Sequence, residues 1–161
     1  MKRTPPPPAA SVRPHNKTLA AWLAFLLGPL GIHRFYLHGL LDVLGWLHPV
    51  PTALGLWGLQ RMQRFGQDDP LSWWLLPWIG IGIAVTCLTA ILYALEKPAT
   101  WNSRHNPGWP ADHLAGRTSG LTVTAVVGAL MVGTVALMSS LAFAFQRYFE
   151  YQVQQGLMIS Q

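Results

Sequence analysis

The chain has 161 residues, of which 51% are hydrophobic and only 11% are charged, and its mean hydropathy is +0.28. Soluble domains carry charge on about a quarter of their residues, so this composition argues against a soluble domain. The net charge of +5 would suit nucleic acid, but no basic helix, zinc-ligand spacing or RNA-binding aromatic motif accompanies it. We therefore expect a lipid bilayer as the main partner and no nucleic acid, because the basic residues flank apolar segments.

Residues 1–16 form a basic, proline-rich tail in which four consecutive prolines begin at Pro5. Such a run excludes a helix and favours extended polyproline II, so we expect the tail to be disordered. The apolar segment that follows lacks a small-x-small cleavage site after it. This favours a retained membrane segment over a cleaved signal peptide.

The first two apolar segments are 19–32 and 37–59, within a predicted domain at residues 17–65. The first is short for a bilayer crossing, which needs roughly 20 apolar residues. Pro49 and Pro51 interrupt the second, and each disrupts the helical turn before it. Segment 37–59 is therefore either one kinked span or a short, partly embedded helix followed by a second helix. We prefer a helix, a break near His48 and a second helix that together complete the crossing.

Segments 71–95 and 121–145 are the clearest predicted spans, within a two-helix region at 71–145. Trp and Tyr near both ends of the first are typical of the aromatic belts of membrane helices. The polar connector 96–120 predicts a surface loop, and the tail 146–161 would extend the last helix. The fold class that we predict is all-α: a polytopic integral membrane helical bundle, with a helical hairpin followed by two further transmembrane helices.

Small residues recur every four positions in two of these segments and predict helix faces that a neighbouring helix can approach closely. The predicted packing positions are Ala20, Ala24, Gly28, Ala125, Ala129 and Gly133. Leucine at Ala24, Gly28, Ala129 or Gly133 is expected to disturb assembly.

The distribution of Lys and Arg predicts an orientation. Four spans would place seven of these residues on the side of the two termini and four on the other side. The positive-inside rule then places both termini in the cytoplasm of a multi-pass protein, in a bacterial inner or plasma membrane.

A charged and aromatic cluster, Gly-Ile-His-Arg-Phe-Tyr-Leu at residues 31–37, separates the first two apolar segments. Charge so close to a bilayer core is costly, so it is usually paired or functional. If a helix begins near Arg34, then Arg34, His38 and Asp42 lie at i, i+4 and i+8 on one face. Arg34 is the only full positive charge between residues 19 and 59, and Asp42 is the only acid. We predict that they pair, with His38 as a bridge.

The alternative is that His33 and Arg34 bind a lipid phosphate or an acidic group of a partner. Whichever holds, Phe35 and Tyr36 are most simply interface anchors that set the depth of the hairpin. The candidate site residues are His33, Arg34, Phe35, Tyr36, His38 and Asp42.

The sequence of residues 28–37 resembles the signature of the TM2 domain, a pair of hydrophobic helices joined by a short linker with an (Asp/His)-Arg-Phe-Tyr motif. Lys17 before the first helix and Gly-Leu-Trp at 55–57 extend the resemblance over about residues 17–65. Two family features are absent: His38 stands where glycine is usual, and the second helix lacks its late acid. The resemblance implies a membrane protein and names no activity.

No catalytic motif and no paired intramembrane acids occur, so we name no catalytic residue and expect no enzyme. His33 and His38 are poorly spaced for one metal, and Cys87 is the only cysteine, so neither a metal nor a cofactor is expected. The function that we expect is a non-catalytic interaction, scaffolding or regulatory membrane module, with a membrane protein partner or a homo-oligomer. The alternative is a subunit of a small oligomeric transporter or channel, with Arg34, His38 and Asp42 along a polar path.

Overall fold

The computed structural model describes residues 13–159, and every regular element in that range is helical. Most of the tail that was predicted to be disordered therefore lies outside the described residues. The elements are α1 (Lys17–Leu27), η1 (Gly28–Leu30), α2 (Ile32–His38), α3 (Val43–Leu47), α4 (Pro49–Phe65), α5 (Pro70–Leu75), α6 (Pro77–Leu95), α7 (Pro98–His105), η2 (Leu114–Gly116) and α8 (Gly120–Ile159).

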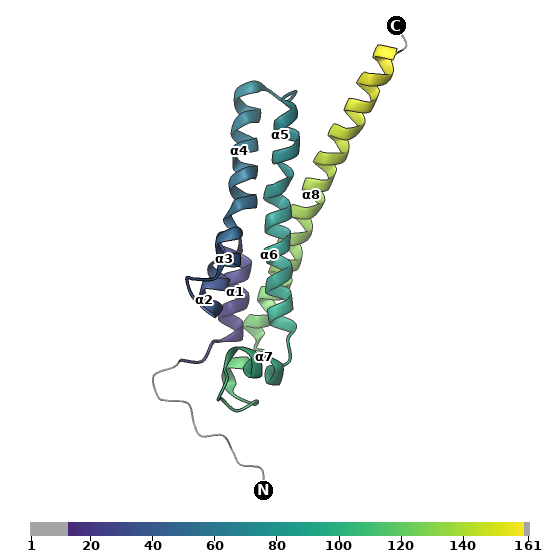
Figure 1. Ribbon diagram of the computed structural model, residues 1–161. Coiled ribbons are helices and arrows are strands. Elements are labelled where there is room, and N and C mark those ends of the chain that lie inside the picture. Colours follow the sequence, from purple (N-terminus) through teal and green to yellow (C-terminus); the bar gives the residue numbers. More distant parts are fainter. Residues whose placement is uncertain (1–12, 160–161) are drawn as a thin grey trace.

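The long helices α4, α6 and α8 run along the axis of an elongated bundle (Figure 1). The shorter α1 packs beside α6 and α8 near one end, which also holds α7. We call this the α7 end, and the opposite end, where α4 and α5 meet, the α5 end. Helix α8 has 40 residues, which makes it about 60 Å long, and it continues beyond the α5 end.

The chain reverses direction at Gly31, before the first apolar segment has run the full length of the bundle. Helix α1 and η1 end at Gly31, and α2 then returns toward the start of α1. The backbone N–H of Asn16 donates to the Tyr36 hydroxyl at 2.8 Å, which places the end of α2 beside the start of α1. The chain then leaves through α3 and α4, with the break at His48, where the two prolines predict it. Together these elements travel the length of the bundle once.

As a result, the start of α1 and the end of α8 lie at opposite ends of the bundle (Figure 1). In a bundle that crosses a bilayer, these two ends face opposite sides. The expectation that both termini lie in the cytoplasm stays a prediction. It counted two crossings before residue 65, whereas the described helices of that range run along the bundle once.

Small side chains fill the contact between α1, α6 and α8. Ala24 and Ala129 are buried with Cys87 and Ala90 in one cluster, and a second cluster joins Ala21, Ala94 and Ala125. Because small residues let helix backbones approach closely, they allow the tight three-helix packing.

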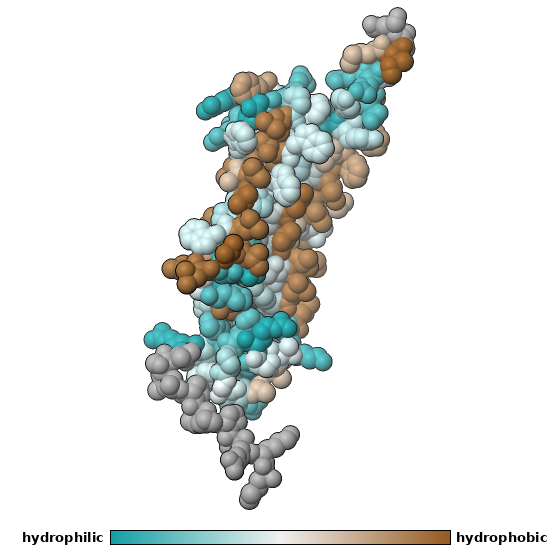
Figure 2. All heavy atoms as spheres, in the orientation of Figure 1, coloured by the Kyte–Doolittle hydropathy of each residue, from teal (hydrophilic) through white to brown (hydrophobic). Residues whose placement is uncertain are grey.

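Two stretches are long and apolar enough to cross a membrane, Pro70–Leu95 and Leu114–Ile159. Only 33% and 22% of their most apolar windows are buried inside the protein. The remaining apolar side chains face outward, along the middle of the bundle, while hydrophilic side chains gather toward its ends (Figure 2). Such a surface suits a hydrocarbon environment and would be a large exposed apolar patch in water.

Candidate functional site

The site begins at a chain reversal that only glycine fits well. Gly31 has a φ of 74°, in the left-handed region, and its N–H donates to the carbonyl oxygen of Gly28 at 2.8 Å. Next in the chain, α2 carries the motif back toward the α7 end. A Cβ at Gly45, in α3, would lie 2.4 Å from the Phe35 ring. Phe35 therefore packs against α3, where its ring centroid is 5.1 Å from that of Trp46.

Arg34 and Asp42 form an ion pair across the turn between α2 and α3. The Nε of Arg34 donates to Oδ2 of Asp42 at 2.6 Å, and the two side chains are 23% and 13% exposed. Asp42 also caps α3, because its Oδ1 accepts from the N–H of Leu44 at 3.2 Å. Hydrogen bonding from Arg34 lowers the pKa of the Asp42 carboxyl. The pair thus fastens α2 to the start of α3.

The structure brings Arg34, His38 and Asp42 together, but not on one helix face. Helix α2 ends at His38, and Gly39 turns the chain with a φ of 82°. His38 Nδ1 is 3.9 Å from Asp42 Oδ2, beyond hydrogen-bonding distance. The expected i, i+4, i+8 geometry is therefore wrong: the contact comes from a turn between two short helices.

His33 points into the protein and is fully buried. Its ring lies 5.0 Å from the ring of His48 and 6.0 Å from that of Tyr93, measured between centroids. Neither ring nitrogen has a hydrogen-bond partner among the described residues. The buried position takes His33 away from any headgroup, so the lipid-phosphate alternative loses one of its two residues.

Tyr36 joins α2 to the beginning of α1. Its hydroxyl oxygen accepts from the N–H of Asn16. Its ring packs edge-on against the His15 ring, with centroids 5.2 Å apart. Asn16 in turn caps α1, since its Oδ1 accepts from the N–H of Leu19. Tyr36 therefore holds the hairpin closed.

Lys17 has a role that sequence reasoning missed. Its side chain is fully buried, and Nζ donates to the carbonyl oxygen of Glu96 at 2.9 Å and to Oγ1 of Thr118 at 2.7 Å. These contacts tie the start of α1 to the end of α6 and the start of α8. Burial lowers the pKa of Lys17, and the Glu96 charge opposes that shift. A lysine directly before an apolar segment was the available signal, and the sequence analysis had used it for orientation and for the family resemblance alone.

A second ion pair, at the α5 end, was also missed. Arg61, on α4, contacts both carboxylate oxygens of Asp69, with Nε–Oδ2 and Nη2–Oδ1 distances of 2.9 and 2.8 Å. Asp69 also caps α5 by accepting from the N–H of Ser72. The Arg61 guanidinium and Ser72 hold the pKa of Asp69 well below its usual range. The acid that the family pattern predicts inside the second helix is absent there, whereas Asp69 lies in the turn after that helix.

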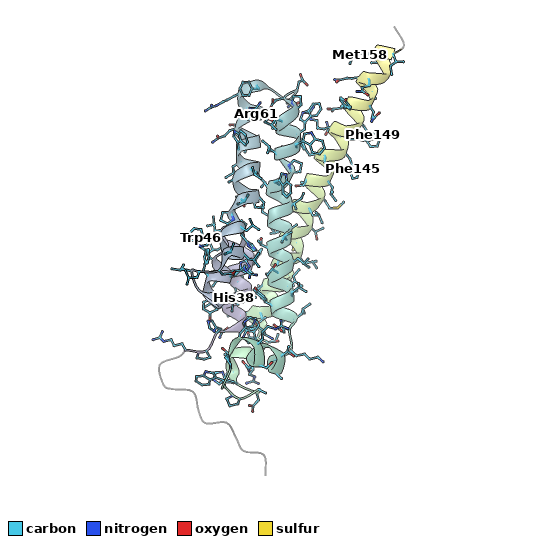
Figure 3. All side chains as sticks on the ribbon, viewed as in Figure 1. His38, Trp46, Arg61, Phe145, Phe149 and Met158 are labelled. Carbon is cyan, nitrogen blue, oxygen red and sulfur yellow. The ribbon has the colours of Figure 1, made fainter. Side chains whose placement is uncertain are left out.

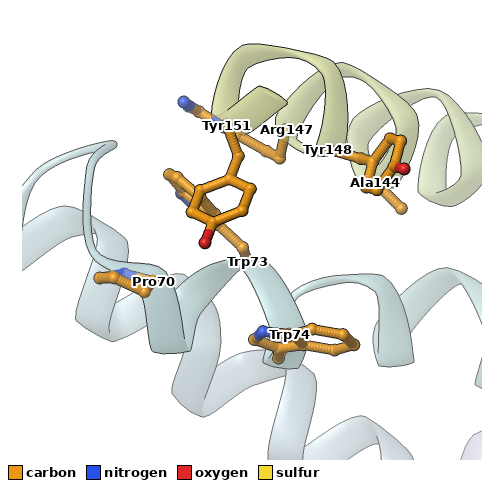
Figure 4. Close-up of a pocket in the computed structure, with 7 residues that line it drawn as sticks. All are labelled: Pro70, Trp73, Trp74, Ala144, Arg147, Tyr148 and Tyr151. Carbon is orange, nitrogen blue, oxygen red and sulfur yellow. The ribbon is translucent and has the colours of Figure 1, made fainter. Parts of the chain in front are cut away.

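An aromatic pocket of about 420 Å³ lies where α5 meets α8 (Figure 4). The Arg147 guanidinium lies 5.4 Å from the centroid of the Trp73 ring and donates to Glu150 at 2.7 Å. Cation–π contact of this kind joins α8 to the start of α5. The pocket is lined by Pro70, Trp73, Trp74, Ala144, Arg147, Tyr148 and Tyr151.

The predicted packing positions lie at internal helix contacts. Ala20, Ala24, Ala125 and Ala129 are fully buried. A Cβ at Gly28 would lie 2.4 Å from the Cβ of Thr86, and one at Gly133 would lie 2.8 Å from that of Cys87. These faces are therefore occupied within the chain by α1, α6 and α8. No group of three or more potential metal-ligating side chains occurs within residues 13–159.

The all-helical bundle, with its outward apolar belt and its charged motif at a chain reversal, defines a helical membrane protein. Residues 13–60 match the family model of the TM2 domain, so the chain contains a TM2 domain, built from α1 to most of α4. No curated protein and no solved structure matches the chain. Helices α5 to α8 lie beyond the family match.

Proposed function

We propose that this is a multi-pass protein of a bacterial inner or plasma membrane and that it serves as a non-catalytic interaction module. In this proposal, α4, α6 and α8 cross the bilayer, and the TM2 domain is a structural hairpin at the α7 end. The contact surface for a partner is the outward face of α8 from Phe145 onward, where the helix passes α5 and then extends beyond the bundle. The observation that carries the proposal is the apolar stripe on that extension.

The stripe consists of Phe145, Phe149 and Val153, which recur every fourth residue and are 59%, 63% and 62% exposed. Figure 3 shows Phe145 and Phe149 on the part of α8 that leaves the bundle. Every side chain from 151 to 159 is exposed. A helix of about 14 residues is marginal alone in water, so burial of the stripe against another helix would stabilise this extension.

The partner that we propose is a second copy of the chain. The only charged side chains in 146–159 are Arg147 and Glu150, and they pair with each other at 2.7 Å. The same face on two copies can therefore meet about a two-fold axis without like charges opposing each other. A different membrane protein would be a separate outcome of the experiment below.

Other features support a structural role over transport or catalysis. The motif charges Arg34 and Asp42 neutralise each other, and close-packed small residues fill the contact between α1, α6 and α8. The lack of a catalytic sequence motif supports a non-catalytic protein.

The proposed orientation places the α7 end in the cytoplasm. Of the nine Lys and Arg among the described residues, five lie near that end and three near the α5 end, and the ninth, Arg34 on α2, is paired with Asp42. The excess follows the positive-inside rule. At the α7 end they are Arg13, Lys17, Lys97, Arg104 and Arg117; at the α5 end they are Arg61, Arg64 and Arg147. The end of α8 then lies outside the cytoplasm.

Site-directed disulfide cross-linking in native membranes tests the contact surface. In a Cys87→Ala background, Phe149→Cys and Val153→Cys should form disulfide-linked dimers on mild oxidation. Gln154→Cys is the matched control, because it lies about 100° around the helix from Val153. Equal cross-linking at all three positions would show random collision. A disulfide to another protein at Phe149 alone would replace the second copy with a different partner.

A further inference from the structure

A cavity of about 350 Å³ lies at the α7 end, between three segments that are far apart in sequence. Residues 13–15 form one wall, the end of α2 a second, and α7 with the turn after it the third. The polar and aromatic side chains that line it are Arg13, His15, His38, Arg104, His105 and Trp109. Neither the TM2 motif pair nor the α8 stripe belongs to this cavity.

Hydrogen bonds hold the walls of the cavity together. The N–H of His15 donates to Oδ1 of Asn106 at 2.6 Å, and the carbonyl oxygen of His15 accepts from Nε1 of Trp101 at 3.0 Å. Trp101 is fully buried and Asn106 is buried, so these partners are fixed by the surrounding structure. The cavity is therefore built before any ligand binds, which reduces the ordering cost of binding.

The charge of the cavity is positive. Arg13 has no ion-pair partner among the described residues, and Arg104 uses Nη1 to contact Oε1 of Glu96 at 2.9 Å. A guanidinium has five N–H donors, so this contact leaves Arg104 able to bind a second anion. The acid nearest His38, Asp42, is already paired with Arg34. Two arginines on different walls are suited to the geometry and charge of a phosphate group.

The histidine on α7 contributes polarity rather than charge at neutral pH. Burial, followed by repulsion from His38 and Arg104, lowers the pKa of His105 to about 4. Its ring is therefore neutral at pH 7 and has one N–H donor and one acceptor. Charge recognition in the cavity consequently rests on Arg13 and Arg104.

We propose that this cavity binds a phosphate group, carried by an anionic lipid or by a free phosphate ion. Two observations connect the cavity to the bilayer. Leu40 and Leu41, just after His38, are 71% and 95% exposed, and would meet acyl chains beside the cavity. Trp109, on its wall, is a residue type that membrane interfaces favour.

The test uses the full-length protein in detergent and two probes. Native mass spectrometry with an equimolar mixture of phosphatidylglycerol and phosphatidylcholine reports the lipid that is retained. Calorimetric titration with sodium phosphate reports the free ion. Arg13→Gln and Arg104→Gln remove one cavity charge each, and Arg117→Gln removes an exposed arginine near the same end that does not line the cavity.

Preferential retention of phosphatidylglycerol, weakened roughly threefold to tenfold by each cavity variant and unchanged in Arg117→Gln, would support the proposal for a lipid. The same pattern with sodium phosphate would support it for a free ion. The proposal is overturned if neither probe binds, or if Arg117→Gln weakens binding as much as Arg13→Gln. Because Arg13 has no ion-pair partner in the described chain, its variant tests binding even if Arg104→Gln disturbs folding.

Discussion

Gly31 and Gly45 approach each other so closely that a Cβ on Gly31 would lie 2.1 Å from the carbonyl oxygen of Gly45. This contact brings the reversal before α2 against the backbone of α3. It sets the point at which the first apolar segment turns back. As a result, the TM2 domain runs along the length of the bundle once.

Alanine at Gly31 should destabilise the protein more than alanine at Gly39. Both residues have left-handed backbones, with φ of 74° and 82°. Alanine at either position therefore lowers the free energy of unfolding by about 1–2 kcal/mol through backbone strain. Gly39 has nothing within 4 Å of its would-be Cβ, whereas Gly31 meets backbone. Thermal unfolding in detergent should show the larger loss for Gly31→Ala. Equal losses would mean that the contact with Gly45 relaxes at no cost.

The Arg34–Asp42 pair should behave as one structural unit. Arg34→Gln and Asp42→Asn should each lower the melting temperature, because each leaves a half-buried polar partner without its counterpart. The double variant should lose less than the sum of the two, as interacting residues do. A double-variant cycle on melting temperatures measures this coupling. Strict additivity would indicate that the two side chains act independently.

Acid should weaken the α5 end through Asp69. Because Arg61 and Ser72 lower its pKa in the folded state, this carboxylate stabilises the fold at pH values above its ordinary pKa of roughly 4. That contribution is lost as the pH falls below about 4, toward the lowered pKa. Asp69→Asn should therefore melt at a lower temperature at pH 7 and lose less stability on acidification. Asp68→Asn, at an exposed neighbouring aspartate, is the control and should retain the wild-type pH profile.

Leucine at Ala129 should disrupt the fold of the single chain. Ala129 is fully buried against the α1 and α6 small residues, and overpacking of this kind typically costs about 1–3 kcal/mol. Val127, which is 53% exposed, accepts leucine on the outward surface and serves as the control. Thermal unfolding should detect the loss for Ala129→Leu alone. If Ala129→Leu unfolds normally but no longer forms dimers, the face that carries Ala129 would instead serve assembly, as the sequence predicts.

The two ends of α8 should be accessible from opposite sides of the membrane. In a Cys87→Ala background, Ser103→Cys probes the α7 end and Gln152→Cys the extension of α8, since both positions are exposed. A membrane-impermeant thiol reagent added to intact cells should label only Gln152→Cys, and labelling of Ser103→Cys should require permeabilised cells. Labelling of both from one side would contradict the proposed odd number of crossings.

Local chemistry was enough to predict a helical membrane protein, and resemblance to the family signature at residues 28–37 identified the TM2 domain. Apolar runs, prolines and belt aromatics act through nearby residues, so their effects can be read along the chain. The break at His48 follows from Pro49 and Pro51, which disrupt helical hydrogen bonding wherever they occur. Arg34 and Asp42 were predicted as partners because no other full charges lie between residues 19 and 59.

Contacts between segments that are far apart in the sequence decided the arrangement of the helices, which local patterns did not predict. Lys17 meets Glu96 and Thr118 across 79 and 101 positions of sequence, and no local pattern announces such a contact. The left-handed Gly31 permits a reversal, but only the space beside Gly45 and Phe35 makes it the place where α2 folds back. That packing lets the chain from α1 to α4 run along the bundle once, and so the end of α8 lies at the opposite end of the bundle from the start of α1. Small-residue faces likewise show that helices meet closely, while only the packed bundle shows that α1, α6 and α8 meet one another.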